Sequence, residues 1–111
     1  MKVFISQPMR GKTSARIEKE RNDAISYIKT LYKDVEVIDS ILDITDKTLI
    51  ECLGESIKLL AQADIVYFCK DWENYRGCRI EHNICMEYGI KTIGDLNNVV
   101  SIKEYMGNKE N

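Results

Sequence analysis

An uninterrupted apolar run at residues 64–69 constrains the fold more than any other feature of the sequence. Five apolar residues, Ile-Val-Tyr-Phe-Cys, follow Asp64 directly. Such a run is typical of a strand that is covered on both faces, as at the centre of a parallel sheet. It is far shorter than the roughly 18 apolar residues that a membrane span needs. The run therefore predicts a buried central strand and no membrane partner.

Strand-like and helix-like segments alternate on either side of this run. Strands are predicted at residues 2–5, 35–39, 64–69 and 91–93. Helices are predicted from Thr13 or Ser14 to Tyr32, from Thr45 or Asp46 to Leu60, from Cys78 to Tyr88, and weakly at 101–106. This alternation with short connections predicts an α/β protein with helices on both faces of a parallel sheet, in the strand order 2-1-3-4.

Length and charge limit the classes to which the protein can belong. The chain has 111 residues, which predicts one domain over residues 1–111, because two domains would each be too small for a sufficient core. Its 16 basic and 18 acidic residues leave no basic surface for duplex nucleic acid. A strand-like pattern begins at the N-terminus without a leader sequence, which predicts a cytoplasmic protein. The four cysteines form no C-x-x-C pair and are expected to be free thiols.

The strand order predicts where a ligand binds. Ligands of such sheets lie beyond the carboxyl ends of the strands where the order reverses, here between the first and third strands. The loops at this point are residues 6–13 and 70–77. Gly11-Lys12-Thr13 resembles the end of a P-loop, but Ser6 replaces the motif's first glycine and Pro8 has no backbone N–H for a phosphate cradle. We therefore expect no ATP or GTP hydrolysis, although the loop and helix start can bind a ribose or phosphate group.

Two aromatic residues in the second loop have two possible roles. Trp72 and Tyr75 lie outside any helical or strand period. Their rings could stack on a nucleobase, and they could equally cover the hydrophobic core. The residues alone leave both interpretations open.

Glu81 stands out in the third long helix. On a helical wheel it lies within the apolar arc formed by Cys78, Ile80, Ile84, Cys85 and Tyr88. A buried carboxylate is costly unless it is bound by a partner. Glu81 could be a structural group that caps the helix or pairs with Arg21 or Arg76. It could also be a nucleophile or base facing the ligand crevice, kept ionised by a helix N-terminus close by.

Two further arrangements have structural interpretations that we favour. Arg21 lies on the buried stripe of the first long helix and is expected to pair with a carboxylate. Cys78, His82 and Cys85 lie on neighbouring faces of one helix and raise the possibility of a metal site. Because a fourth ligand is missing, we expect two core thiols, a surface imidazole and no metal.

Two motifs carry a resemblance to a known family. Residues 3–11, Val-Phe-Ile-Ser-Gln-Pro-Met-Arg-Gly, are similar to a strand followed by S-x-P-M-x-G, and residues 71–81, Asp-Trp-Glu-Asn-Tyr-Arg-Gly-Cys-Arg-Ile-Glu, are similar to W-E-x-S-x-G-A-x-x-E. On these motifs the chain resembles the nucleoside 2-deoxyribosyltransferase-like superfamily, and within it the DUF4406 branch found in phages and bacteria. The resemblance covers nearly the whole chain. It implies a flavodoxin-like (Rossmann-like) three-layer α/β/α sandwich.

The resemblance also implies a reaction. In the characterised members, a glutamate four residues after a glycine attacks the anomeric carbon of the sugar, and Gly77 and Glu81 have this spacing. Glu81 would then be the nucleophile for N-glycosidic bond cleavage or deoxyribosyl transfer on a nucleoside or nucleotide. Asp71 or Glu73 would protonate the leaving base. Ser56 stands where the transferases often carry an acid.

The remaining implied roles concern binding and assembly. Substrate-binding positions are Ser6, Gln7, Pro8, Met9, Arg10, Gly11, Trp72, Tyr75 and Gly77. The substrate is a small molecule, no cofactor or metal is implied, and the family usually forms homo-oligomers, here a dimer or tetramer. The alternative is a catalytically silent nucleotide-binding or assembly module on the same fold.

Overall fold

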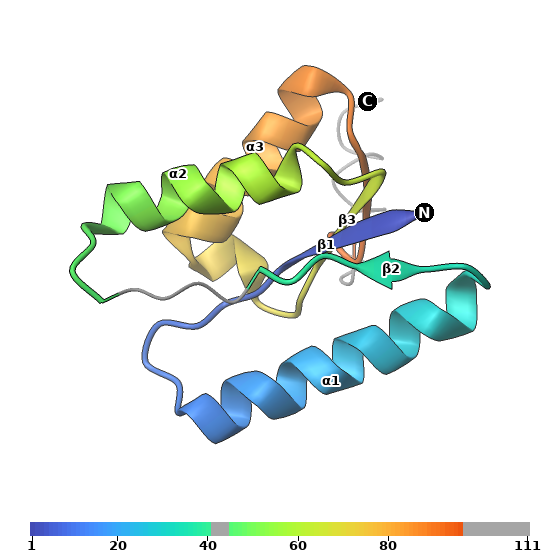
Figure 1. The fold of residues 1–111 in the computed structure, drawn as a ribbon, viewed down its shortest axis with the longest axis horizontal. Helices are drawn as coiled ribbons and strands as arrows, with labels where there is room; N and C mark the ends of the chain where they lie inside the picture. The colour runs from blue at the N-terminus through green and yellow to red at the C-terminus, as the bar shows by residue number, and fades with distance from the viewer. Residues whose placement is uncertain (41–44, 97–111) are drawn as a thin grey trace, which may run out of the picture.

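A computed structural model describes residues 1–40 and 45–96 of the chain. Within this part, a four-stranded sheet lies between helices on both faces (Figure 1). The strands are β1 (Lys2–Ser6), β2 (Glu36–Val37), β3 (Ile65–Phe68) and β4 (Lys91–Ile93). The helices are α1 (Ser14–Leu31), α2 (Leu49–Leu60) and α3 (Arg76–Tyr88), and a short 3₁₀ helix, η1 (Trp72–Asn74), precedes α3.

The sheet has the predicted topology. All strand pairs are parallel, and the order is β2-β1-β3-β4. Val3 is in register with Val37 on one side and with Ile65 on the other. The flavodoxin-like fold is thereby confirmed, and the order reverses between β1 and β3. Both segments expected to surround the ligand follow these two central strands.

Two hydrophobic clusters hold the helices against the two faces of the sheet. The cluster on the α1 side contains Val3, Ile5, Ala24, Ile28, Ile65 and Cys69. The cluster on the side of α2 and α3 contains Phe4, Ile38, Leu60, Val66, Phe68 and Cys85. Successive side chains of a strand point to opposite faces, so Ser6 at the end of β1 shares the face of Phe4. This alternation directs the Ser6 hydroxyl toward α2 and α3.

Several boundaries differ from those predicted. β1 extends to Ser6, and β2 has only two residues instead of five, because this edge strand pairs only with Lys2 and Val3. Residues 70–77 are not a continuous loop, since η1 forms within them and α3 begins at Arg76. Tyr88 was placed on the buried arc of α3 but is 80% exposed. It lies beyond Cys85, the residue of α3 that belongs to the core cluster.

The start of α2 is set by a capping box. The hydroxyl of Thr48 accepts a hydrogen bond from the backbone N–H of Glu51, and the Glu51 carboxylate accepts one from the backbone N–H of Thr48. The prediction of Thr45 or Asp46 as the first residue was wrong, because this reciprocal pair satisfies two free helix donors at once. By contrast, Thr13 caps α1 as expected, through a bond from the Arg16 backbone N–H.

Two further expectations concern the last predicted helix and a membrane span. The weak helix predicted at residues 101–106 lies outside the described residues. In the described ranges, no helix combines the length and apolar character required to traverse a lipid bilayer.

Candidate functional site

The candidate site centres on the carboxylate of Glu81, which is buried between three elements. The Ser6 hydroxyl at the end of β1 donates to Glu81 Oε1 at 2.6 Å. The Ser56 hydroxyl from α2 donates to Oε2, also at 2.6 Å. Glu81 lies on α3 and is 6% exposed. Two short bonds therefore fix both oxygens and leave the carboxylate with lone pairs for a further interaction.

The surroundings of Glu81 act on its pKa in opposite directions. Burial raises the pKa above its ordinary value, because a carboxylate loses hydration in the protein interior. The hydrogen bonds from Ser56 and Ser6 lower it, and the net shift is upward. The two hydroxyls, rather than an opposite charge, are thus the groups that favour the ionised form.

The N-terminus of α3 contributes less to the ionised form of Glu81 than predicted. α3 begins at Arg76, two residues before the expected start, so Glu81 is in the second turn and not in the first. The field of the helix dipole falls off within the first turn. Pairing of Glu81 with Arg21 or Arg76 was the other expectation, and the partners found are the two serines.

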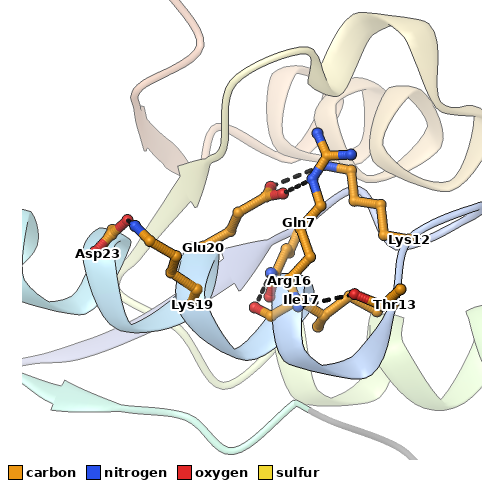
Figure 2. A network of polar contacts seen from close by, with 8 residues as sticks. All are labelled: Gln7, Lys12, Thr13, Arg16, Ile17, Lys19, Glu20 and Asp23. Carbon is orange, nitrogen blue, oxygen red and sulfur yellow. Dashed lines mark hydrogen bonds and ion pairs between the residues drawn. The ribbon is translucent and has the colours of Figure 1, made fainter.

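The loop after β1 is more buried than a typical surface loop. Gln7 is 7% exposed, and its amide nitrogen donates to the Ile17 carbonyl at 2.7 Å, which ties the loop to α1 (Figure 2). Within the described residues, Gln7 Oε1 is buried without a hydrogen-bond partner. Pro8 is fully buried and Met9 half-buried, whereas Arg10 is exposed. The hydrogen bond to Glu81 comes from Ser6, just before this loop.

A turn closes this loop just before α1. Gly11 has a φ of +79°, which favours glycine, and the Lys12 backbone N–H donates to the Met9 carbonyl at 3.1 Å. The Lys12 side chain turns inward, where its ammonium contacts Glu20 at 2.8 Å and lies 5.7 Å from the centre of the Tyr75 ring. Lys12 therefore joins the loop after β1 to the segment that precedes α3.

The candidate residues in the segment after β3 differ in their exposure and in their contacts. Asp71 and Glu73 are both exposed, and neither contacts Glu81. Asp71 has a left-handed backbone with a φ of +68°. Tyr75 is half-buried beside Lys12. Gly77 lies in the first turn of α3 with open space where a side chain would begin.

Trp72 packs on the core beside an unexpected partner. Its ring is 5.2 Å from that of Phe68 and stacks on the imidazole of His82 at 4.3 Å. Of the two roles left open by the sequence, these contacts favour a cover over the core. His82 is not the expected surface imidazole, because it stacks on Trp72 and its Nε2 lies 2.9 Å from Asp95 Oδ2.

The cysteines on α3 are buried thiols, as predicted. Burial raises the pKa of Cys78 and of Cys85 to about 11, so both thiols stay protonated near neutral pH. Among residues 1–40 and 45–96, no three His, Cys, Asp or Glu side chains are grouped in a way that could hold a metal ion.

Arg21 has a structural role in joining two segments of the described chain. Its guanidinium donates to the Ser40 hydroxyl at 3.2 Å and to the Ile38 carbonyl at 3.0 Å. Burial lowers the pKa of Arg21, while the charge of Asp39 opposes this shift. These bonds attach α1 to the chain that follows β2.

A hollow of about 320 Å³ lies at the same edge of the sheet, on the α1 side. It is lined by residues of α1, of the loop before it, and of the end of β3 with the turn that follows: Lys12, Arg16, Glu20, Asp23, Ala24, Tyr67, Cys69, Lys70 and Asp71. We refer to it as the α1 hollow. Glu81 does not line it, because Ser6 and Glu81 lie on the opposite face of the sheet.

Comparison with known protein families places most of the chain in one of them. The model of the family described as "Domain of unknown function (DUF4406)" matches residues 1–94. No curated protein and no solved structure matches the chain.

Proposed function

The chain belongs to the DUF4406 family, and we propose that it cleaves the N-glycosidic bond of a nucleoside or nucleotide, or transfers its deoxyribosyl group, with Glu81 as the nucleophile. One observation carries this proposal. Glu81 is a buried carboxylate held by two serine hydroxyls beside the point where the strand order reverses. Its hydrogen-bond partners among residues 1–40 and 45–96 are neutral hydroxyls, which is unusual for a purely structural carboxylate.

The proposed reaction proceeds in two displacements. Glu81 attacks the anomeric carbon, the bond from this carbon to the base nitrogen breaks, and a glycosyl ester forms. An acid protonates the departing base. Water or a second base then attacks the same carbon and releases the carboxylate, so that two inversions give net retention.

Asp71 or Glu73 would supply this acid, since both follow the central strand β3 and are exposed. Ser6 and Ser56 orient the nucleophile. Gly77 allows a ligand to approach the backbone closely, and Gln7 Oε1 is an acceptor that a sugar hydroxyl could satisfy.

A second candidate function is supported by the burial of the same residue. A nucleophile must reach its substrate, and Glu81 is only 6% exposed, with both oxygens already bonded. These contacts favour a catalytically silent nucleotide-binding or assembly module. Trp72, which packs on the core instead of presenting a free ring, favours it as well.

Trapping of the intermediate distinguishes the two candidates. A nucleoside with fluorine at the 2-position of its sugar slows breakdown of the glycosyl ester, since fluorine destabilises the oxocarbenium-like transition state. We expect intact-mass spectrometry to show one glycosyl group per chain, and peptide mapping to place it on Glu81. With methanol as acceptor, the methyl glycoside should keep the starting configuration. An inverted product without an adduct would instead mean that Glu81 activates water, and no turnover of any deoxynucleoside or monophosphate would favour the silent module.

Replacing Ser56 by alanine should change the pH profile of base release. The reaction needs the ionised carboxylate, so the rate falls as the pH drops through the pKa of Glu81. Removal of the Ser56 bond takes away a group that lowers this pKa, so the acid limb should move to higher pH. Ser56→Thr keeps the hydroxyl and should restore the original limb. An unchanged or oppositely shifted limb in Ser56→Ala would exclude this role for Ser56.

The expected dimer or tetramer stays a prediction. Leu49 and Ile50, at the start of α2, are 73% and 77% exposed. Such apolar surface is compatible with contact to a second copy of the chain. The nucleoside or nucleotide partner likewise stays a proposal, tied to the reaction above.

A further inference from the structure

A cluster of aromatic side chains surrounds the single imidazole of the protein. The sequence contains one histidine, His82 on α3, and one tryptophan, Trp72 in η1. Their rings stack with centroids 4.3 Å apart and an interplanar angle of 26°. The ring of Phe68, from the central strand β3, is 5.0 Å from the imidazole and inclined to it by 73°. The imidazole therefore contacts rings of β3 and η1, and the reaction proposed above assigns it no role.

The imidazole also has a carboxylate partner from the chain that follows β4. His82 Nε2 lies 2.9 Å from Asp95 Oδ2, and the same oxygen accepts a hydrogen bond from the Thr92 hydroxyl, also at 2.9 Å. The Asp95 side chain is 8% exposed, and that of His82 is 22% exposed. Gly94, with a φ of +80°, turns the chain directly before Asp95. The pair therefore ties the end of β4 to α3 in a position from which most water is excluded.

The titratable groups around His82 come from three elements. Asp95, after β4, supplies the charge in contact with the imidazole. Arg79 lies one turn earlier on α3, where its guanidinium donates to the Glu73 carbonyl of η1 at 3.0 Å, and the Glu73 side chain is exposed. Cys85 lies one turn later, and burial is the main cause that raises the pKa of its thiol to about 11, with a contribution from Asp95. A proton gained by His82 therefore meets a carboxylate at contact distance beside an uncharged thiol.

A proton on the imidazole would strengthen both of these contacts. Histidine is the side chain that changes its charge between about pH 5 and 8. The hydrogen bond to Asp95 would then join two groups of opposite charge, and such bonds are stronger than those with a neutral partner. The face of an indole ring attracts a cation, so the stack on Trp72 gains as well. Acidification within this range therefore favours the contacts of His82 with Asp95 and Trp72 at the same time.

We propose that His82, Asp95 and Trp72 form a proton-operated clamp, which holds η1 against α3 and the end of β4 more tightly when the imidazole is charged. The segment that the clamp holds bears Asp71 and Glu73 on either side of Trp72. Mild acidification therefore restrains the backbone that carries these two carboxylates. Their part in base release rests on the function proposed above, whereas the clamp is independent of that function.

The fluorescence of Trp72 tests the contact, because an imidazolium that touches an excited indole quenches it by accepting an electron. The emission of the full-length protein should fall in one step as the pH decreases from about 8 to about 5. His82→Gln keeps an amide that can donate to Asp95 but takes up no proton, and should show no step. In Asp95→Asn the step should move to lower pH by about one unit or more, because the charge that favours the imidazolium is gone. Asp23→Asn removes a carboxylate from α1, on the other face of the sheet, and should leave the step unchanged.

Backbone hydrogen exchange tests whether the charge tightens the segment. The N–H groups of Asn74 and Tyr75 donate to the carbonyls of Asp71 and Trp72, so they report on η1. After correction for the pH dependence of exchange in unstructured peptides, their protection should be about twofold to fivefold greater at about pH 5.5 than at about pH 7.5. In His82→Gln the protection should be equal at the two pH values.

The outcomes separate the clamp from the proposed reaction. A wild type without an emission step, or a step that persists in His82→Gln, would overturn the contact between imidazolium and indole. A step without greater protection of η1 would overturn the clamp. Circular dichroism verifies the fold of each variant, and if His82→Gln does not fold, the shift in Asp95→Asn and the exchange of the wild type decide. Neither measurement involves a nucleoside, so a protein that shows both effects without base release would contradict the reaction alone.

Discussion

Substitution of Glu81 by glutamine should reduce base release by at least about a thousandfold, which corresponds to about 4 kcal/mol in the activation free energy. The amide has nearly the shape of the carboxylate but cannot attack the anomeric carbon as an anion. Release of free base from deoxynucleosides and their monophosphates, followed by chromatography, measures the loss. A variant with wild-type turnover would show that another group is the nucleophile.

The fold should survive this substitution. Serine hydroxyls can rotate to accept a hydrogen bond, so Ser6 and Ser56 can each bond either end of a glutamine amide. The raised pKa of Glu81 means that its charge is disfavoured in the folded protein, and this cost develops as the pH rises from the ordinary pKa of a glutamate through the raised one. Glu81→Gln should therefore be at least as stable as the wild type at neutral pH. An unfolded variant would show that the carboxylate is a structural group.

Replacement of Gly94 by alanine should destabilise the fold by about 3 kcal/mol. Gly94 has a φ of +80°, and an added Cβ would lie 2.5 Å from the Phe68 carbonyl oxygen and 2.9 Å from the Tyr67 ring. The backbone strain costs about 1 kcal/mol, and the clash with the central strand adds about 2 kcal/mol. Urea unfolding measures the change in the free energy of unfolding.

Gly89 provides a matched control for this substitution. It ends α3 with a φ of +66°, and nothing lies within 4 Å of the position that a Cβ would occupy. Gly89→Ala should therefore show only the backbone cost of about 1 kcal/mol. Equal losses in the free energy of unfolding of the two variants would show that the Cβ added at position 94 makes no destabilising clash with β3.

The order of the elements could be predicted because each long segment has a clear period. The apolar run of β3 identified the centre of the sheet, and the alternation around it gave the strand order. The length of the edge strand β2 was overestimated. The β-branched residues at 35–39 favour an extended backbone, but they do not determine how many residues of β1 are available for pairing. The start of α2 was missed because Thr48 and Glu51 act as a pair across one turn.

The candidate site could be predicted only in part. The helical period placed Glu81 on the buried face of α3, and the sheet order placed Ser6 at the same edge. Ser56 as a direct partner of Glu81 depends on the packing of α2 on α3, which no local period expresses. The contacts of Lys12 with Glu20 and of Trp72 with His82 are likewise set by tertiary packing. For Lys12, the Gly11-Lys12-Thr13 similarity to a P-loop was the signal that could have drawn attention to it.

The parallel pairing of β1 with β3 also bears on how the chain folds during synthesis. The centre of the sheet can form only after Ile65, the partner of Val3, has been synthesised, and Ile65 is 62 positions further along the chain. Until then, Phe4 and its apolar neighbours in β1 lack the strand that buries them. A chain emerging from the ribosome therefore exposes the apolar residues of β1 until β3 has been synthesised, and exposed apolar segments of this kind are prone to aggregate.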